Sequence, residues 1–303
     1  MRGLLHTFAR ALWGPLLGGD PTQVFAAETK LFGAAGGRES SPPTFRLQDI
    51  SSGNLGQDQY PNRPGEKKKG MRAGFRPGQR RTIAFRPRRY SIEGTKAVPS
   101  LVAMLWATAW AAFSFGGIGI RSRRGYGSLT VEAGTSLPEL GAGPLPLFES
   151  VPADPLALRR DLHRGLNIVR QTAYQWLMEN GFSPDLKSGC PPYPFFQIAG
   201  PEQIYVGPGE EDRGADARND NALVLLMDAC SKALDTQPQL FKRSLGGANP
   251  RLASPLWVRF YRTEKGLVPV ATFSPLVEEQ GLARKILTEL KATPLQSSEG
   301  AAS

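Results

Sequence analysis

The sequence has few of the residues that build disulfide frameworks and metal sites. Its 303 residues include two cysteines, Cys190 and Cys230, and two histidines, His6 and His163. Two cysteines form neither a disulfide framework nor a structural zinc site alone, so we interpret them as buried thiols in a reducing, cytoplasmic compartment. The scarcity of histidine argues against a histidine-based metal cluster. We therefore expect no metal and no other cofactor.

Long apolar segments are also scarce. Residues 98–115 form an uncharged stretch of 18 residues, the minimum length of a membrane span. The stretch is rich in alanine and contains Pro99 and Thr108, so we interpret it as a helix buried inside a soluble protein and expect no membrane partner. Residues 1–19 loosely resemble a signal or transit peptide, but His6 and Arg10 interrupt their apolar core, which argues against export.

Acidic residues are scarce in the first part of the chain. Residues 1–130 contain 20 basic and 7 acidic residues, whereas residues 131–303 contain 17 basic and 20 acidic ones. Within the first part, residues 63–96 alone contain 12 basic and 2 acidic residues. This asymmetry points to a polyanionic partner held by the N-terminal half, and either nucleic acid or an acidic membrane surface would fit.

Glycine and proline together account for 60 residues, about a fifth of the chain, against an ordinary share of about 12%. We therefore expect long loops and a mixed α+β fold. Apolar periodicity predicts helices at residues 2–17, 98–115, 158–177, 219–234 and 282–290. Strand patterns occur at residues 44–50, 81–89, 128–132 and 195–206, and residues 256–262 and 267–273 read as a hairpin.

The remaining segments divide the chain. Residues 27–33 are expected to follow a loop as a short segment, and residues 51–79 read as a linker by composition. The Gly/Pro-rich residues 134–155 mark the boundary between two halves. Residues 295–303 form a polar tail.

The predicted first helix carries a basic stripe. Arg2, His6 and Arg10 are spaced four residues apart and so share one face, away from the apolar positions. The stripe is either the solvated side of the helix or a surface that faces a phosphate backbone.

The most specific segment is FGGIGIRSRRGYGSL, residues 115–129. Glycine lets the backbone approach a ligand closely, and arginine supplies forked donors that match phosphate oxygens. The segment is not a dinucleotide-binding fingerprint, because position 122 is serine and the loop follows a helix, and it contains no GK[ST]. We interpret it as a loop shaped to a sugar-phosphate backbone, in preference to a structural turn with solvated arginines.

With this helix-to-loop segment, the sequence resembles the RAMP superfamily of CRISPR-associated proteins, and more narrowly the first RAMP subunit of the type III-B Cmr effector complex. Two further matches occur in family order. The opening MRGLLHTFARALWG followed by AETKLFG resembles the first helix and a Glu-x-x-Leu-Phe-Gly element of that subunit. NPRLASPLWVRFY, residues 249–261, resembles the Arg-x-Ala-Ser-Pro-Leu element of its second half.

The resemblance implies an α+β fold of tandem ferredoxin-like (RRM-like) domains, at residues 1–133 and 156–294, with a basic insertion at 51–80 and the glycine-rich loop at 116–127. It implies a non-catalytic subunit that holds guide RNA near its 3′ end in antiviral defence. The partners would be CRISPR guide RNA, target single-stranded RNA and other RAMP subunits. The loop matches residue by residue, which gives as RNA contacts Gly117, Gly119, Arg121, Ser122, Arg123, Arg124, Gly125 and Gly127. Arg2 and Arg10 match helix positions, while charge alone supports Lys67, Lys68, Lys69 and Arg72.

The sequence departs from the family at its start. Family members carry a strand before the opening helix, whereas this chain begins at the helix. In a ferredoxin-like sheet, ordered 4-1-3-2, that strand is central. We therefore expect Met1 to be a misassigned start, and the chain as given to be poorly soluble or dependent on partners.

Three alternative functions remain open. An RNA-processing endonuclease of the same superfamily would use His6 as general acid or base. A RAMP backbone subunit would cleave target RNA through a loop aspartate, with Asp49 and Asp58 as candidates. A peripheral membrane protein would bind through residues 63–96. His163 is interpreted as an ordinary helix residue, and Cys190 has no local partner that would make it a nucleophile.

Overall fold

The computed structural model begins with two helices, α1 (Arg2–Leu16) and α2 (Pro21–Phe32). It describes residues 2–33, 43–51, 57–60, 72–75, 80–87, 97–117, 128–129, 140–147, 152–186, 197–209, 256–264, 266–273 and 280–294. The predicted first helix is confirmed. The expected loop before residue 27 is wrong, because Asp20 caps α2 by accepting hydrogen bonds from the backbone N–H groups of Thr22 and Gln23. Pro21 then starts the helix, as proline often does.

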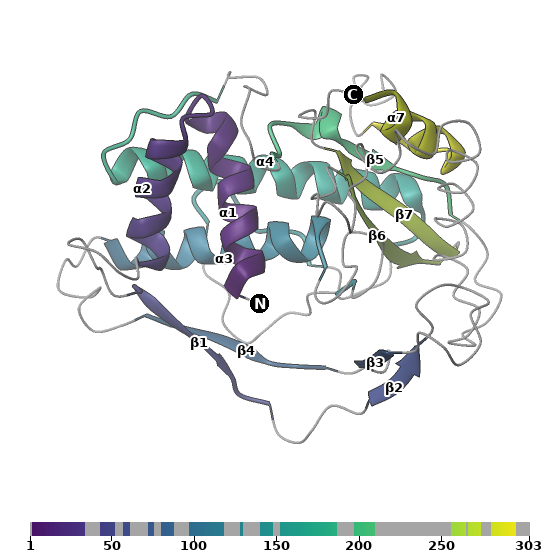
Figure 1. The fold of residues 1–303 in the computed structure, drawn as a ribbon, viewed down its shortest axis with the longest axis horizontal. Helices are drawn as coiled ribbons and strands as arrows, with labels where there is room; N and C mark the ends of the chain where they lie inside the picture. The colour runs from purple at the N-terminus through teal and green to yellow at the C-terminus, as the bar shows by residue number, and fades with distance from the viewer. Residues whose placement is uncertain are drawn as a thin grey trace.

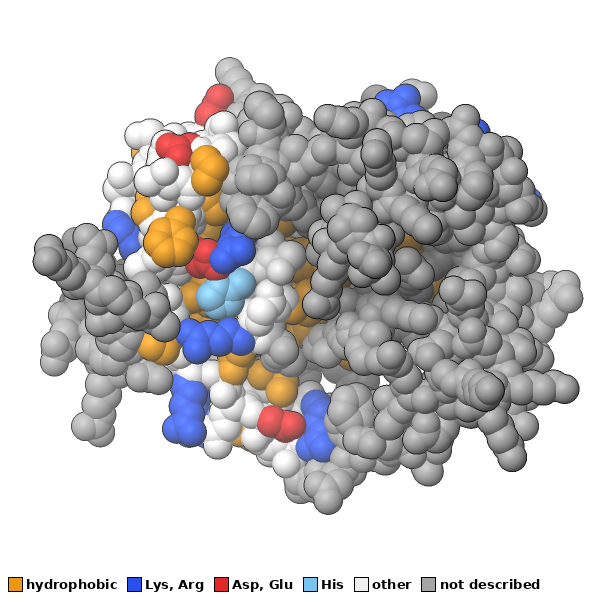
Figure 2. Space-filling view, viewed as in Figure 1, with side chains coloured by type: hydrophobic (Ala, Val, Ile, Leu, Met, Phe, Trp, Pro, Cys, Tyr) orange, Lys and Arg blue, Asp and Glu red, His pale blue; other side chains and the backbone are white. Residues whose placement is uncertain are grey.

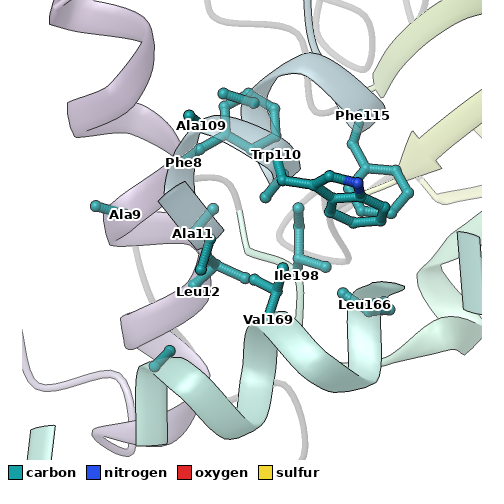
Figure 3. Close-up of a cluster of buried hydrophobic side chains, with 14 of the residues drawn as sticks. Phe8, Ala9, Ala11, Leu12, Ala109, Trp110, Phe115, Leu166, Val169 and Ile198 are labelled. Atoms are coloured by element: carbon teal, nitrogen blue, oxygen red, sulfur yellow. The ribbon is translucent and has the colours of Figure 1, made fainter. Parts of the chain in front are cut away.

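Two long helices form the centre of the molecule, α3 (Ala97–Phe115) and α4 (Pro155–Glu179). They pack on each other and both contact α1. Their shared core contains aromatic and aliphatic side chains from all three helices, among them Phe8, Leu12, Trp110, Leu166 and Val169 (Figure 3). The apolar stretch predicted as a buried helix is therefore confirmed as α3. Among the described helices, none is both long and apolar enough to cross a membrane.

Two short antiparallel pairs follow α2 in the chain. β1 (Phe45–Asp49) pairs with β4 (Ile83–Pro87), which places Leu47 opposite Phe85 and confirms both predicted strands. β2 (Gln57–Tyr60) pairs with β3 (Arg72–Phe75). The second pair corrects the prediction of a linker over residues 51–79. The prediction rested on the scarcity of residues that could enter a hydrophobic core. A two-stranded ribbon does not need such a core, because its backbone groups pair with each other. Figure 1 shows β1 and β4 running beneath the helices.

The C-terminal part forms a four-stranded antiparallel sheet with the order β6-β7-β5-β8. The strands are β5 (Ile204–Val206), β6 (Leu256–Thr263), β7 (Gly266–Phe273) and β8 (Thr293–Pro294), and α7 (Gln280–Glu289) joins β7 to β8. Numbered along the chain, this order is 2-3-1-4, which is the ferredoxin-like order read from its other edge. The predicted hairpin and last helix are confirmed. The tandem arrangement of two such domains stays a prediction.

The strand predicted over residues 195–206 is shorter than expected. In the described part of that segment the strand covers only Ile204–Val206, and a single turn of 3-10 helix, Pro201–Gln203, precedes it. Proline has no backbone N–H to give to a ladder, so Pro201 favours the turn over the strand. Gln203 is buried there, and its side-chain amide donates to the carbonyl oxygens of Gln197 and Phe273, both at 3.2 Å.

One hydrophobic core connects the two predicted halves. The Trp13 ring of α1 stacks on Trp176 of α4, with ring centroids 5.2 Å apart. Phe8 of α1 meets Trp257 of β6 edge to face at 5.4 Å. The predicted division near residues 134–155 stays a prediction. Outside the described residues lie the predicted helix 219–234, residues 130–132 of the predicted strand, the tail 295–303 and both cysteines; Ser128 and Leu129 are not in a strand.

Candidate nucleic-acid interface

The basic stripe of α1 faces α2. Arg2 donates from Nη2 to the carbonyl oxygen of Phe32 at 2.8 Å, and the His6 ring stacks on the Phe32 ring with centroids 4.1 Å apart. One turn further on, Arg10 reaches Glu28. Figure 2 shows this face, where basic groups, an acidic group and a histidine gather over α1 and α2. The stripe is therefore partly a contact between helices, and not only a solvated surface.

Glu28 is the centre of this cluster, and its side chain is nearly buried at 6% exposure. Arg10 binds it through two parallel hydrogen bonds, Nε to Oε2 and Nη2 to Oε1, both at 2.8 Å. His6 Nδ1 shares a short hydrogen bond with Oε1 of the same carboxylate. Burial raises the pKa of Glu28, but hydrogen bonds from His6 and Arg10 and their positive charge outweigh it, so the pKa lies below its ordinary value. Glu28 is therefore a carboxylate at neutral pH.

The cluster retains a surface that a ligand can reach. The side chains of His6 and Arg10 are 25% and 34% exposed. Glu28 holds the His6 ring through Nδ1, while Nε2 makes no hydrogen bond among the residues that the structure describes. A carboxylate that fixes an imidazole in this way is the arrangement that orients a general base. Chemically, the cluster offers one oriented imidazole and two guanidinium groups that already have acceptors.

The glycine-rich segment starts where α3 ends. Gly116 donates its backbone N–H to Ala112 O at 3.0 Å and packs directly on the ring of Phe8. A Cβ at position 116 would lie 2.6 Å from both the Ala112 oxygen and the Phe8 ring, so this close approach requires glycine. Gly117, a predicted RNA contact, is the next residue and is buried.

The same segment ends against β6. The backbone N–H of Phe260 donates to the Ser128 hydroxyl at 3.3 Å, and Arg259 donates from Nη2 to the Leu129 carbonyl at 2.7 Å. The next residue, Tyr261, donates its hydroxyl hydrogen to the carbonyl of Ser114 at 2.9 Å. Ser114 belongs to the last turn of α3. We call these three consecutive residues of β6, 259–261, the β6 clasp, because they contact the chain on both sides of the glycine-rich segment.

Arg259 is an unusual member of the clasp because it is 1% exposed and has no carboxylate partner within the described part of the chain. Its guanidinium lies over the Tyr261 ring, 3.8 Å from the centroid. Its Nε and Nη1 atoms are buried with no hydrogen-bond acceptor among the residues that the structure describes. Burial lowers the pKa of Arg259 and raises that of Tyr261, while the attraction between the two groups opposes both shifts. A buried cation that faces a carbonyl oxygen and the Tyr261 side chain, with no carboxylate near it among the described residues, is energetically costly.

Sequence reasoning missed both Glu28 and Arg259 as site residues. Glu28 lies within the AETKLFG element, but no spacing rule pairs it with a helix that begins 26 residues earlier. Arg259 interrupts the apolar residues of LWVRFY. A charged residue inside an apolar strand pattern is unusual, and this could have marked Arg259 as a candidate site residue.

The other predicted contacts are spread over the chain. Gly119, Arg121, Ser122, Arg123, Arg124, Gly125 and Gly127, with Lys67, Lys68 and Lys69, lie outside the described residues. Arg72 starts β3, opposite Tyr60. The structure therefore brings Arg2 and Arg10 together on α1 and places Gly117 at the end of α3.

The candidate aspartates of the backbone-subunit alternative lie on the strand pairs. Asp49 ends β1, where it accepts a hydrogen bond from the Ser51 N–H at 2.9 Å and lies 3.5 Å from Arg81. The hydrogen bonds from Ser51, and then the charge of Arg81, keep the pKa of Asp49 below its ordinary value. Asp58 lies in β2, opposite Gly74. No three acidic, histidine or cysteine side chains of the described residues are close enough to hold a metal ion.

Sequence comparisons find no matching family model and no matching curated protein. Comparison of structures does find relatives. The crystal structure of apo Cmr1 from Pyrococcus furiosus matches 97% of this chain and 89% of its own, with a TM-score of 0.62 and 18% identity. The chain shares the fold of Cmr1. A chain of the type III-B Cmr-beta complex, determined by cryo-electron microscopy with cognate target RNA, AMPPnP and single-stranded DNA, matches 95% of this chain and 91% of its own. Its TM-score is 0.56 and its identity 11%. These matches confirm the resemblance to a Cmr RAMP-like protein at the level of the fold.

Proposed function

We propose that this protein is a non-catalytic, RNA-binding subunit of a type III-B Cmr effector complex that holds guide RNA near its 3′ end in antiviral defence. Its partners are CRISPR guide RNA, target single-stranded RNA and other RAMP subunits. The observation that carries the proposal is the glycine- and arginine-rich segment, tied at both ends by the β6 clasp, in a chain with the fold of Cmr1.

The charge of the chain supports RNA as the ligand. Residues 1–130 carry a net charge of +13, and Arg121, Arg123 and Arg124 lie between the glycines of the segment. Guanidinium groups bind phosphate oxygens through paired hydrogen bonds, and glycines let the strand come close to the backbone. The Cmr-beta complex, one chain of which shares this fold, is bound to cognate target RNA, which also favours a single-stranded RNA ligand.

Salt dependence and a matched pair of triple variants test this proposal. We expect the affinity for labelled oligouridine to fall steeply between about 50 and 200 mM salt, because phosphate contacts release counterions. Replacing Arg121, Arg123 and Arg124 together by alanine should weaken binding. It should also make the slope of log K against log salt shallower by about 2, since each phosphate contact on a single strand contributes roughly 0.7.

The control removes the same charge from the second half. Arg160, Arg164 and Lys291 are exposed residues of α4 and of the turn before β8, and their replacement by alanine should leave RNA affinity nearly unchanged. Equal losses in the two triple variants would reduce the glycine-rich segment to a structural turn.

A second function, an RNA-processing endonuclease, is favoured by one observation, the hydrogen bond that orients His6 on Glu28. In that mechanism His6 would take or give a proton through Nε2, which has no hydrogen-bond partner in the described part of the chain, during cleavage of the phosphodiester bond. On the main proposal, purified protein leaves RNA intact, and any trace of cleavage is the same in His6→Ala. Reproducible cleavage that is lost in His6→Ala and weakened in Glu28→Gln would place the endonuclease first.

A further inference from the structure

We propose that the outer face of the strand pair β1–β4 binds the sugar-phosphate backbone of single-stranded RNA through Arg46 of β1 and Arg86 of β4. We call these two residues the arginine pair. The inference rests on the proposed function, because it takes RNA as the ligand. It adds two RNA contacts that no sequence pattern predicted.

The two arginines project from the same face of the ribbon. Arg46 lies directly opposite Arg86 in the register of the two strands. Side chains at such positions have Cβ atoms about 4.5–5.5 Å apart. Phe45 is buried on the other face, where Leu47 and Phe85 pack against the core. Because successive residues of a strand alternate between faces, the arginine pair lies on the outer face, and both of its residues are exposed.

The charge of the arginine pair is not balanced within the described part of the chain. Asp49 is the only acidic residue of β1 and β4, and it lies 3.5 Å from Arg81. Neither Arg46 nor Arg86 makes a hydrogen bond or an ion pair with the residues that the structure describes. Like charges directly opposite each other destabilise an antiparallel pair. The stability of the ribbon therefore does not explain two arginines at these positions, whereas a ligand of opposite charge does.

The arginine pair is connected to the basic end of α1 through two aromatic rings. Arg2 donates to the carbonyl oxygen of Phe32, and the Phe32 ring meets the Phe45 ring with centroids 5.7 Å apart, directly before Arg46. Basic side chains in Figure 2 continue from the face of α1 and α2 into the region where Figure 1 draws β1 and β4. An extended polyanion could therefore contact both elements.

The chemistry of the outer face favours RNA over an acidic membrane surface. Guanidinium groups bind phosphate oxygens through paired hydrogen bonds, so two of them can hold a phosphodiester chain. Electrostatic binding to a lipid surface uses clusters of about 4–8 basic residues, whereas β1 and β4 place two on this face. The other side chains of the face on these strands are Gln48 and Ala84, which form no apolar surface that could enter a bilayer.

The test replaces the arginine pair without disturbing the core. We expect the double variant Arg46→Gln/Arg86→Gln to bind labelled oligouridine at least about tenfold more weakly, the factor that corresponds to one hydrogen bond to a charged group. The slope of log K against log salt should become shallower by about 1.4, since each phosphate contact on a single strand contributes roughly 0.7. The matched control is Arg160→Gln/Arg164→Gln, which removes the same charge from exposed positions of α4 and should change neither quantity.

A charge reversal separates RNA binding from stability. Arg46→Glu places a carboxylate opposite Arg86, and opposite charges at such positions stabilise a strand pair. We expect a thermal unfolding midpoint equal to or above that of the unchanged protein, together with weaker RNA binding. A lower midpoint in Arg46→Glu would contradict the register and exposure on which the proposal depends.

The outcomes distinguish this inference from the proposed function. If the unchanged protein binds oligouridine without salt dependence, the proposed function is wrong. If it binds as expected but the variant of the arginine pair binds as well as the control, only the present inference is wrong. A double variant that keeps its RNA affinity but no longer binds vesicles of phosphatidylcholine and phosphatidylserine in equal parts would assign the arginine pair to a membrane surface and overturn the inference.

Discussion

Arg10 and Arg259 show two opposite ways of holding a guanidinium group in one protein. Arg10 lies on α1, one third exposed, and both of its parallel hydrogen bonds end on the Glu28 carboxylate. Arg259 lies in β6, 1% exposed, with one carbonyl acceptor and an aromatic face. The first arginine is neutralised where water can also reach it, whereas the second is buried with no carboxylate partner among the described residues. Arg10 therefore joins two helices, while Arg259 joins β6 to the carbonyl of Leu129.

The largest expected effect comes from removing the carboxylate that pairs with Arg10. Glu28→Ala removes the acceptor of both His6 and Arg10, and charge-assisted hydrogen bonds contribute about 1.5–3 kcal/mol each. Arg10 is partly exposed and can bind water once Glu28 is gone, so the losses should not simply add. We expect the free energy of unfolding to fall by about 3 kcal/mol in total, which equals the upper value for a single charge-assisted bond. Chemical denaturation followed by circular dichroism measures it. A loss below about 1 kcal/mol would mean that the cluster does not hold α1 on α2.

The next effect concerns Gly116, at the start of the segment that the β6 clasp holds. In Gly116→Ala the new Cβ would lie 2.6 Å from the Phe8 ring, and overpacking of this kind costs about 1–3 kcal/mol. Gly3→Ala is the control on α1, because nothing lies within 4 Å of its added Cβ, and it should stabilise the helix by about 0.5–1 kcal/mol. Thermal melting of the two variants should therefore shift in opposite directions. Shifts of the same sign would contradict the packing described for Gly116.

A pH titration sharpens the comparison, because it acts on Glu28 and not on Arg259. The pKa of Glu28 is lower in the folded protein than in the unfolded chain, so its contribution to stability is complete above its ordinary pKa and is lost as the pH falls through the lowered, folded-state value. We expect Glu28→Gln to flatten the acid limb of a plot of unfolding free energy against pH. An acid limb that is unchanged in Glu28→Gln would show that other carboxylates carry it.

The smallest effect comes from an exposed ion pair. Arg164 donates to Asp161 at 3.2 Å on α4, and the two side chains are 62% and 39% exposed. Exposed pairs of this spacing contribute about 0.5 kcal/mol or less, so Asp161→Ala should leave the denaturation midpoint nearly unchanged. A loss as large as that in Glu28→Ala would mean that burial does not distinguish the two ion pairs.

Local sequence patterns predicted the helices and strands well where apolar residues at helical or strand spacing are buried in the core. Leu158, Leu162, Leu166 and Val169 repeat every three or four residues, and the structure places them on the buried face of α4. The start of α2 was missed although Asp20 and Pro21 are typical of a helix start. β2 and β3 were missed because a linker composition says nothing of backbone pairing between two short segments.

The candidate site was only partly predictable for a different reason. The spacing of Arg2, His6 and Arg10 on one face followed from the helical period alone. Their contact with Glu28 depends on how α1 and α2 pack, and that packing is decided by side chains elsewhere in the core. The contact between Arg259 and Leu129 joins positions 130 residues apart, and no local pattern reaches that far. Contacts between positions so far apart in the sequence can be identified only from the three-dimensional structure.

The β6 clasp also imposes an order in time on the newly made protein. The helices α1 to α3 and the glycine-rich segment are synthesised first, whereas Arg259 follows Leu129 by 130 residues. At about 5–20 residues per second, the ribosome needs roughly 7 to 26 s to add that length of chain. During this interval the segment exists without the residues that hold its two ends. The contacts to Ser114, Ser128 and Leu129 can therefore form only after the strand that supplies Arg259, Phe260 and Tyr261 has been made.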